Sequence, residues 1–321
     1  MRWNLRSSLT SSLAVSLSLS LALTACSGSG SSGSSAPQAA AVAPAATTPA
    51  PAPATPATPV STHPNVGVTV PVGPIVLVHG VDPVSLFTSQ EVHFIGIPTA
   101  LQNEGASVIR PMRAGMNSID LRARQLKDAI LAAYPDPSVK VNLIAHSMGG
   151  LDARYMITHL AMADRVASLT TISTPHRGTP ISDVALGILP GPSQQVLDTM
   201  LNVIGWDLDF AINTSEDYIQ NTFNPSTPNH PGVFYQSWAG RCDPIGATGA
   251  RVRAVLIPTW TVIAADEGAN DGIIPVSSSQ WGLFRGTIGS DHFGELGLPQ
   301  RGFDHTQFYL DVAEDLAQRG F

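Results

Sequence analysis

Cysteine is scarce in this 321-residue chain, which contains only Cys26 and Cys242. This scarcity excludes the disulfide-dense scaffolds of small secreted domains. If Cys26 carries a lipid or is removed with a leader segment, Cys242 has no partner in the chain. An internal disulfide is therefore not expected.

Basic residues are also in the minority, with 17 Lys and Arg against 24 Asp and Glu and a formal net charge of -7. Nucleic-acid binding needs a basic face that releases counterions from phosphates, so a nucleic-acid partner is excluded. No repeat of fixed period appears along the chain, which excludes repeat architectures. The hydrophobic content of 43% is ordinary for a globular protein.

Residues 1–26 have the pattern of a signal peptide, with two arginines near the start, an uncharged Leu/Ser/Ala/Val stretch and a small-residue end. The stretch is too rich in serine to persist as a membrane span. The final Leu23-Thr24-Ala25-Cys26 resembles the bacterial lipobox, in which the cysteine becomes lipidated. We therefore expect export and a membrane anchor at Cys26, with an ordinary cleaved signal and secretion as the alternative. The residue after Cys26 is Ser27 and not an aspartate. By resemblance to bacterial lipoproteins, this favours a location at the outer membrane or cell surface.

Residues 27–73 are Ser/Gly-rich and then Ala/Pro/Thr-rich, without one Lys, Arg, Asp or Glu. Such a segment buries too little apolar surface to offset its ordering entropy. We interpret it as a flexible tether between anchor and domain, in which His63 is solvent-exposed.

Residues 74–321 alternate short apolar runs with amphipathic ones, which favours one α/β domain with a mostly parallel sheet and helices on both faces. The apolar runs predict strands at residues 74–78, 141–144, 169–172 and 260–263. Residues at helical spacing predict one helix with Ile119, Leu126, Ile130 and Ala133, and a closing helix, N-capped by Asp304, with Phe308, Val312 and Leu316.

Ala145-His146-Ser147-Met148-Gly149-Gly150 directly follows a predicted strand and precedes a helical run from Leu151 to Leu160. A turn this sharp strains the serine backbone, needs small neighbours, and presents the hydroxyl at a helix N-terminus, where the dipole favours negative charge. The usual pattern is Gly-x-Ser-x-Gly, and here Ala145 replaces the first glycine. We predict Ser147 as a nucleophile; the alternative is a small-residue turn with a surface serine.

A serine hydroxyl is a weak nucleophile that needs a base, and the base needs an acid to orient it. In this fold the acid follows the serine in the chain and precedes the histidine. Asp271, in the polar loop Ala269-Asn270-Asp271-Gly272, is the predicted acid. Asp266 and Glu267 are competitors, and Asp271 closing a turn with Gly272 is the structural alternative.

His292 is the predicted base, because it lies in the glycine-flanked loop Gly289-Ser290-Asp291-His292-Phe293-Gly294. His305, at the start of the closing helix, is the competitor. His146 is adjacent to the nucleophile, so we expect its side chain to point elsewhere.

Acyl transfer also needs donors that face the tetrahedral oxyanion. The N–H of Met148, directly after the serine, is one candidate. Val81 N–H is the second, because Gly80 allows the loop after the first strand to turn its amides inward. A tight turn without a ligand role is the alternative.

Several segments, in the same order, resemble the secreted triacylglycerol lipases of Pseudomonas and Burkholderia, which are α/β-hydrolases. The resemblance rests on residues 78–80, 94–101, 140–147, 173–179 and 270–272. It implies a lipase acting on lipid esters, with Ser147, Asp271 and His292 as the triad and with Met148 and Val81 as the oxyanion-hole amides.

Three departures limit what the resemblance implies. The paired cysteines of the family are absent. Asp243 fits the position of one calcium ligand, but Gly294 stands where the family has an aspartate, so we expect no required cofactor and at most weak calcium binding; Asp291 or Glu295 are the carboxylates that could substitute. The dedicated foldase of the family is not carried over to a chain that looks tethered.

Residues 180–230 form an insertion longer than a simple strand connection. Its apolar residues are concentrated at Val196, Met200, Leu201, Ile204, Trp206, Leu208 and Phe210. In such lipases this region holds the acyl-chain pocket and a lid, and an apolar helix over a serine site would bind acyl chains and exclude water. The alternative is that these side chains complete the core.

The sequence therefore predicts a carboxylic ester hydrolase, foremost a triacylglycerol lipase that forms an acyl-enzyme. An esterase or polyester depolymerase with the same triad is the alternative within the class, because fold and triad do not separate these substrates. A surface lipoprotein that uses an inactive hydrolase fold for binding is the alternative outside it.

Overall fold

The computed structural model describes residues 67–81, 93–111, 115, 117–190, 208–247 and 250–321, which belong to one compact unit. The predicted signal peptide with Cys26, His63 and most of the predicted tether lie outside the described residues. Among the helices that are described, none is long and apolar enough to cross a bilayer.

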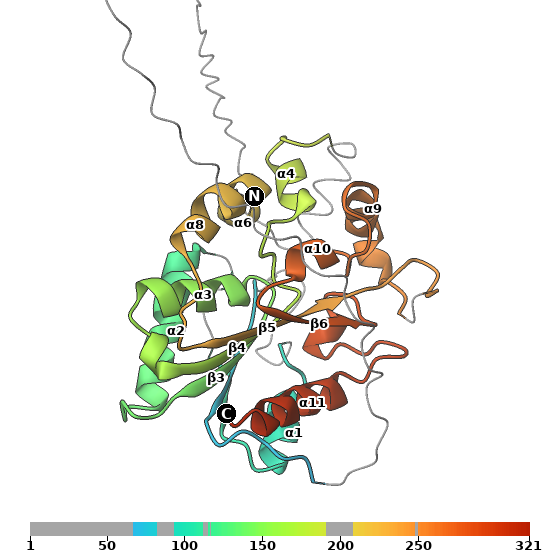
Figure 1. The fold of residues 1–321 in the computed structure, drawn as a ribbon. Coiled ribbons are helices and arrows are strands. Elements are labelled where there is room, and N and C mark those ends of the chain that lie inside the picture. The colour runs from blue at the N-terminus through green and yellow to red at the C-terminus, as the bar shows by residue number, and fades with distance from the viewer. Residues whose placement is uncertain (1–66, 82–92, 112–114, 116, 191–207, 248–249) are drawn as a thin grey trace, which may run out of the picture. The chain divides into compact units, whose positions relative to one another are not determined.

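The sheet has six strands within the described residues, and every neighbouring pair is parallel (Figure 1). Its order is β2-β1-β3-β4-β5-β6. The strands are β1 (Ile75–Val78), β2 (Val108–Ile109), β3 (Val141–His146), β4 (Val166–Ile172), β5 (Phe234–Gly240) and β6 (Leu283–Ile288). The α/β fold is confirmed, and the first three predicted strands correspond to β1, β3 and β4.

The predicted strand at residues 260–263 is wrong, because these residues lie in the helix α9 (Ile257–Asp266). Pro258 occupies its first turn, where a proline fits, and the Thr261 hydroxyl bonds the Ile257 carbonyl one turn back. A four-residue apolar run fits a strand and a helix equally well, and the length of the element decides between them. The strands that complete the sheet, β2, β5 and β6, were not predicted.

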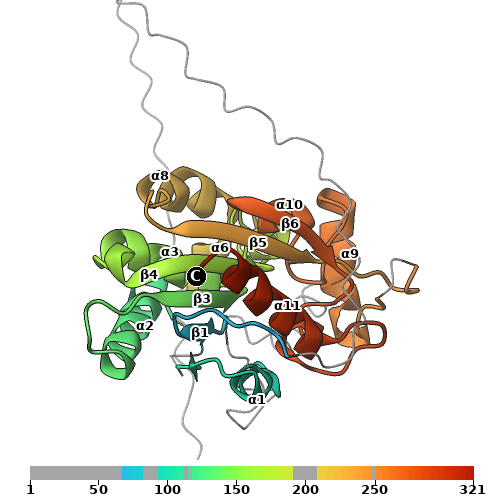
Figure 2. The same cartoon turned by 60° about the horizontal axis from the view of Figure 1, so that its bottom comes forward.

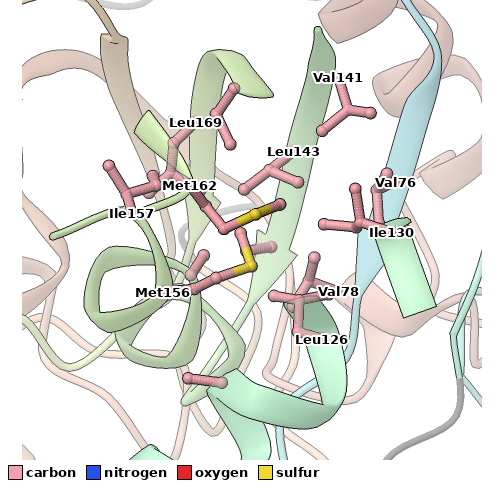
Figure 3. Packing of buried hydrophobic residues seen from close by; sticks show 14 of the residues in the cluster. Val76, Val78, Leu126, Ile130, Val141, Leu143, Met156, Ile157, Met162 and Leu169 are labelled. Atoms are coloured by element: carbon pink, nitrogen blue, oxygen red, sulfur yellow. The ribbon is translucent and has the colours of Figure 1, made fainter. Parts of the chain in front are cut away.

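One face of the sheet is covered by α2 (Ile119–Ala133) and α3 (Gly149–His159). Their apolar side chains interdigitate with Val76, Val78 and Leu143 of the strands (Figure 3). The opposite face carries α1 (Ile97–Asn103) and α11 (His305–Gln318), which contact each other (Figure 2). Helices on both faces are therefore confirmed.

The two predicted helices form with the predicted stripes largely buried. Ile119, Leu126 and Ile130 are buried in α2, whereas Ala133 is exposed at its end. Phe308, Val312 and Leu316 are buried in α11, and the Asp304 side chain caps this helix by accepting from Gln307 N–H at 3.0 Å. The Asp304 carboxylate thus gives a hydrogen-bond acceptor to a backbone amide of the first turn that has no partner within the helix.

The insertion is helical in its described part, residues 180–190 and 208–230. It contains α4 (Pro180–Ala185), α6 (Leu208–Thr214), α7 (Glu216–Tyr218), the π-helical turn η3 (Ile219–Phe223) and α8 (Asn224–Ser226). α4 contacts both α6 and α9, and Figure 1 shows these helices on the side of the molecule away from α1 and α11. Val196, Met200, Leu201, Ile204 and Trp206 lie outside the described residues.

Short elements complete the described chain. They are the 3-10 turns η2 (Ala163–Arg165), η4 (Ala254–Leu256) and η5 (Gly294–Leu296) and the helix α10 (Val276–Ser279). Two of them border the loops that carry the candidate site: α10 follows Asp271, and η5 follows His292.

Candidate active site

Ser147 stands at the turn between β3 and α3, as the sequence predicts. Its φ is +57°, in the left-handed region that a residue with a Cβ rarely adopts. Its N–H donates to the Ile172 carbonyl of β4 at 2.9 Å, which fixes the turn to the neighbouring strand. The geometry is that of a strained nucleophile elbow, with only 3% of the serine exposed.

Two glycines allow the close approach that this turn needs. A Cβ on Gly149 would lie 2.6 Å from the Val78 carbonyl oxygen and 2.7 Å from that of His79. A Cβ on Gly80 would lie 2.6 Å from the Ser147 Cβ. The loop after β1 therefore packs directly against the nucleophile elbow, and any side chain at either glycine would force them apart.

Asp271 and His292 form a buried pair. Asp271 Oδ2 lies 2.7 Å from His292 Nδ1, and Asp271 Oδ1 accepts the N–H groups of Ile273 and Ile274 at 2.8 and 2.7 Å. The Asp271 side chain is fully buried, and His292 N–H donates to the Asp271 carbonyl at 3.0 Å. An aspartate fixed in this way holds the imidazole in the tautomer that leaves Nε2 free to take a proton.

The competitors of these residues lie elsewhere. Asp266 and Glu267 are exposed at the end of α9, and Glu267 contacts the Ser277 hydroxyl. His305 is the first residue of α11. The acid follows a helix instead of the predicted fourth strand, but the chain order serine, acid, histidine is the expected one.

The His146 side chain lies beside His292, whereas we expected it to point away from the site. Its ring packs on that of His292 with centroids 4.4 Å apart, which places His292 beside the residue that precedes the nucleophile. His146 Nε2 lies 3.0 Å from Glu295 Oε2, and Ser173 Oγ donates to Glu295 Oε1 at 2.8 Å. Sequence reasoning missed this network, because a lone glutamate three residues after the histidine gives no pattern.

Burial determines the charge state of this network. Desolvation lowers the pKa of His146 well below its ordinary value, helped by the nearby His292 and His93. Desolvation also raises the pKa of Glu295 well above its ordinary value, helped by the negative charge of Asp271. Both shifts favour the neutral forms of these two side chains, and among the described residues only Nε2 of His146 has a hydrogen-bond partner, because its buried Nδ1 has none.

The candidate oxyanion donors flank Ser147. Met148 is fully buried, and Val81 is partly buried against the same apolar cluster. Within the part of the chain that the structure describes, neither N–H donates to a protein acceptor. Both amides therefore remain available to a ligand oxygen.

A buried arginine holds the loop that carries Val81. Arg122 of α2 donates through Nη2 to the carbonyls of His79 and Gly80 at 3.2 and 2.7 Å. Its Nε donates to Asp152 of α3 at 3.0 Å, and neither side chain is exposed. Sequence reasoning missed this pair; an arginine beside Ile119 on the buried side of an amphipathic helix was the available signal.

An apolar cluster borders the nucleophile. It joins Met148 and Leu151 to Ile181 of α4 and Phe210 of α6. Ile181 and Phe210 of the predicted insertion are therefore buried in the same core cluster as Met148, as the alternative of a completed core predicts for them.

The residues present do not fit the calcium site of the family pattern. Asp243 Oδ1 accepts the N–H groups of Ile245 and Ala247, both at 2.9 Å, in its own turn. A Cβ on Gly294 would lie 2.0 Å from Gln300 Oε1, so this side chain fills the place of the family aspartate. Among the described residues, no group of three metal-type side chains within ligand distance includes Asp243.

The two substitute carboxylates are engaged elsewhere. Asp291 is paired with Arg253, and Glu295 with His146 and Ser173. Neither carboxylate is left to complete a shell of six to eight oxygen ligands around a calcium ion.

Comparison with known proteins identifies the family. Triacylglycerol lipase 2 of Saccharomyces cerevisiae is 31% identical over 255 residues, covering 71% of this chain and 74% of the relative. Triacylglycerol lipase of Burkholderia plantarii is 37% identical over 155 residues, covering 45% of this chain and 42% of the relative. The family described as a PGAP1-like alpha/beta domain matches residues 119–187. This chain belongs to the triacylglycerol lipase family, and it is a serine ester hydrolase.

Solved structures show the same fold. A metagenomic carboxyl esterase aligns with a TM-score of 0.64 at 14% identity, covering 81% of this chain and 80% of that one. The mature lipase BlEst2 of Bacillus licheniformis aligns with a TM-score of 0.55 at 21% identity, covering 74% and 89%. The chain therefore has the α/β-hydrolase fold.

Proposed function

We propose that this enzyme hydrolyses lipid esters, foremost triacylglycerols, through an acyl-enzyme on Ser147. The observation that supports this most is the Asp271–His292 pair, whose imidazole packs on the residue before a strained serine. Relatives named triacylglycerol lipase favour a lipid substrate.

The proposed reaction has two steps, acylation of Ser147 and hydrolysis of the acyl-enzyme. Ser147 Oγ attacks the ester carbonyl while His292 Nε2 takes the hydroxyl proton, and the N–H groups of Met148 and Val81 bind the oxyanion. The imidazolium, stabilised by Asp271, then gives the proton to the departing alcohol. A water molecule repeats the sequence on the acyl-enzyme, which releases the acid and regenerates the serine.

Matched variants test the assignment of the base and the nucleophile. Ser147→Ala and His292→Ala should each lower kcat by about 10⁴-fold or more while the protein stays folded. His305→Ala is the control and should retain activity, because His305 begins α11 and Asp271 pairs with His292. Full turnover by Ser147→Ala, or loss of activity in His305→Ala with activity kept in His292→Ala, would overturn the assignment.

A substrate panel tests the acyl specificity. p-Nitrophenyl esters from acetate to palmitate, a long-chain triglyceride emulsion and a polyester film would be compared at equal enzyme concentration. Preference for the emulsion supports a lipase. Preference for acetate or for the film would instead identify an esterase or a polyester depolymerase, and no turnover of any ester would favour an inactive binding protein.

We also propose that the protein is exported and anchored to a membrane through a lipid on Cys26. The lipobox-like end of the signal-peptide pattern and the uncharged segment that follows support this proposal. Cys26→Ser should move the protein from the membrane fraction to the soluble fraction. Unchanged fractionation, with no lipid mass on the mature N-terminus, would contradict the anchor.

A further inference from the structure

A single arginine ties two segments together beside the candidate base. Arg253 precedes η4, and the segment 291–300 contains His292. The Arg253 guanidinium pairs with the Asp291 carboxylate through Nη1 and donates through Nη2 to the carbonyls of Leu298 and Pro299 at 3.0 and 2.7 Å. Arg253 N–H also donates to Asp291 Oδ2 at 3.0 Å.

These contacts hold both ends of the histidine loop. Asp291 immediately precedes His292, and its Oδ1 also accepts the Gly294 N–H at 2.9 Å. Leu298 and Pro299 mark the far end of the same loop. One planar cation therefore binds acceptors on either side of His292, which a guanidinium can do because its donors are spread over a rigid fork.

The carboxylate in this contact depends on its partner. The Asp291 side chain has no exposed surface, whereas 25% of the Arg253 side chain is exposed. Burial raises the pKa of Asp291 above its ordinary value, and the Arg253 charge is the largest influence that opposes it. A buried carboxylate that lost its cation would have to rearrange or take up a proton.

We propose that Arg253 is a positioning residue, whose guanidinium anchors the catalytic-histidine loop in place of the calcium ion that the family pattern implies. This inference rests on the proposed function, because it takes His292 as the catalytic base. Arg253 supplies the positive charge, and Asp291, Leu298 and Pro299 supply the oxygen acceptors. The Gln300 side chain also links the histidine loop to the segment that contains Arg253. Its Oε1 accepts Asp291 N–H at 2.9 Å, and its Nε2 donates to the Arg251 carbonyl at 3.1 Å.

The position of this loop matters for the reaction. A base displaced by about 1 Å from its productive place costs on the order of 100-fold in rate. The Arg253 side chain contacts the histidine loop and neither of the proposed oxyanion donors, so the loss should appear in kcat with KM little changed. Replacing a residue needed only for stability would lower the melting temperature without this selective fall in kcat.

The test compares Arg253→Gln with Arg251→Gln, a matched control that removes the same charge from an exposed side chain two residues away. Hydrogen–deuterium exchange is measured on peptides covering residues 291–300. Arg253→Gln should accelerate exchange there by about tenfold or more, the equivalent of a lost charge-assisted hydrogen bond, and Arg251→Gln should not. Residues 141–159, which carry Ser147, should exchange as in the wild type.

Kinetics on a p-nitrophenyl ester provide the second readout, with kcat about 10- to 100-fold lower in Arg253→Gln and KM within about twofold. If Arg253→Gln does not fold, Arg253→Lys against Arg251→Lys replaces it, because an ammonium keeps the charge but cannot reach all three acceptors at once. Exchange and kcat unchanged in both Arg253 variants would overturn the proposal.

Calcium itself is the third arm. EDTA followed by added CaCl₂ should leave the melting temperature and the exchange of residues 291–300 unchanged in the wild type. A rise in melting temperature with calcium that Asp243→Asn abolishes would overturn the proposal. The exchange and calcium arms need no substrate, so a wild type without ester hydrolysis would contradict the proposed function while these arms still test the anchor.

Discussion

Replacing Gly80 with alanine should disable the enzyme while leaving it folded. The added Cβ would lie 2.6 Å from the Ser147 Cβ, 3.0 Å from its Oγ and 3.2 Å from the His146 carbonyl oxygen. Optimal separation between non-bonded carbon atoms is about 3.5 to 4.0 Å, so the two segments must part by about 1 Å.

Neither segment can retreat freely. The Gly80 carbonyl is bound by the buried Arg122 at 2.7 Å, and Gly149 lies against the carbonyls of Val78 and His79 on the other side. The displacement therefore falls on the serine hydroxyl and on the adjacent Val81 amide. A misplacement of this size corresponds to about 100-fold in kcat/KM, or about 2.7 kcal/mol of transition-state stabilisation.

The assay is p-nitrophenyl butyrate hydrolysis together with thermal unfolding. Gly289→Ala is the matched control, because its Cβ would meet only the Ala250 Cβ at 3.9 Å. Alanine there should leave kcat/KM unchanged and lower the entropy of the unfolded chain slightly. If Gly80→Ala retains kcat/KM within about twofold of the wild type, the close approach of the loop after β1 to Ser147 is refuted.

Three further variants probe the surroundings of the site. Arg122→Met leaves the buried Asp152 without its cation and should lower the free energy of unfolding by about 3 to 5 kcal/mol in urea titration; a loss below about 1 kcal/mol would contradict the burial of the pair. Asp271→Asn keeps the bonds from two backbone amides but favours the wrong histidine tautomer, so kcat should fall by about 10⁴-fold with little change in melting temperature. The raised pKa of Glu295 means that the folded protein binds this proton more tightly than the unfolded chain. This contribution to stability is fully present below pH 4.5 and is lost as pH rises through the folded pKa. The melting temperature should therefore decline as pH rises above 4.5, and Glu295→Gln should flatten this decline. An equally steep decline in the variant would show that Glu295 is not its source.

The sequence predicts those parts of the fold that local pattern determines. β1 is a continuous apolar run, β3 and β4 contain shorter apolar runs, and these strands are buried on both faces as such runs predict. β5 was missed because its polar members are paired across the sheet, as Gln236 Nε2 is with Thr170 Oγ1 at 3.0 Å. Pairing of this kind depends on tertiary contacts that no local window contains.

The same division holds for the candidate site. A motif, a turn and a chain order predict Ser147, Asp271 and His292, and the structure pairs the last two of them. The charged residues around them were not predicted to act there, because Arg122, Glu295 and Arg253 come from three separate segments and make long-range contacts. A charged residue on a predicted buried face is the signal that finds the first of these; the other two need the structure.

Covalent labelling tests the central claim most directly. An activated phosphonate ester mimics the tetrahedral intermediate and phosphonylates only a serine that has an adjacent base and oxyanion donors. After incubation with a p-nitrophenyl alkylphosphonate, peptide mass spectrometry should find one adduct, on Ser147, with stoichiometric loss of esterase activity. The adduct should be absent from Ser147→Ala and nearly absent from His292→Ala. An adduct on another residue that accompanies the loss of activity, or full inactivation with Ser147 unmodified, would contradict the account.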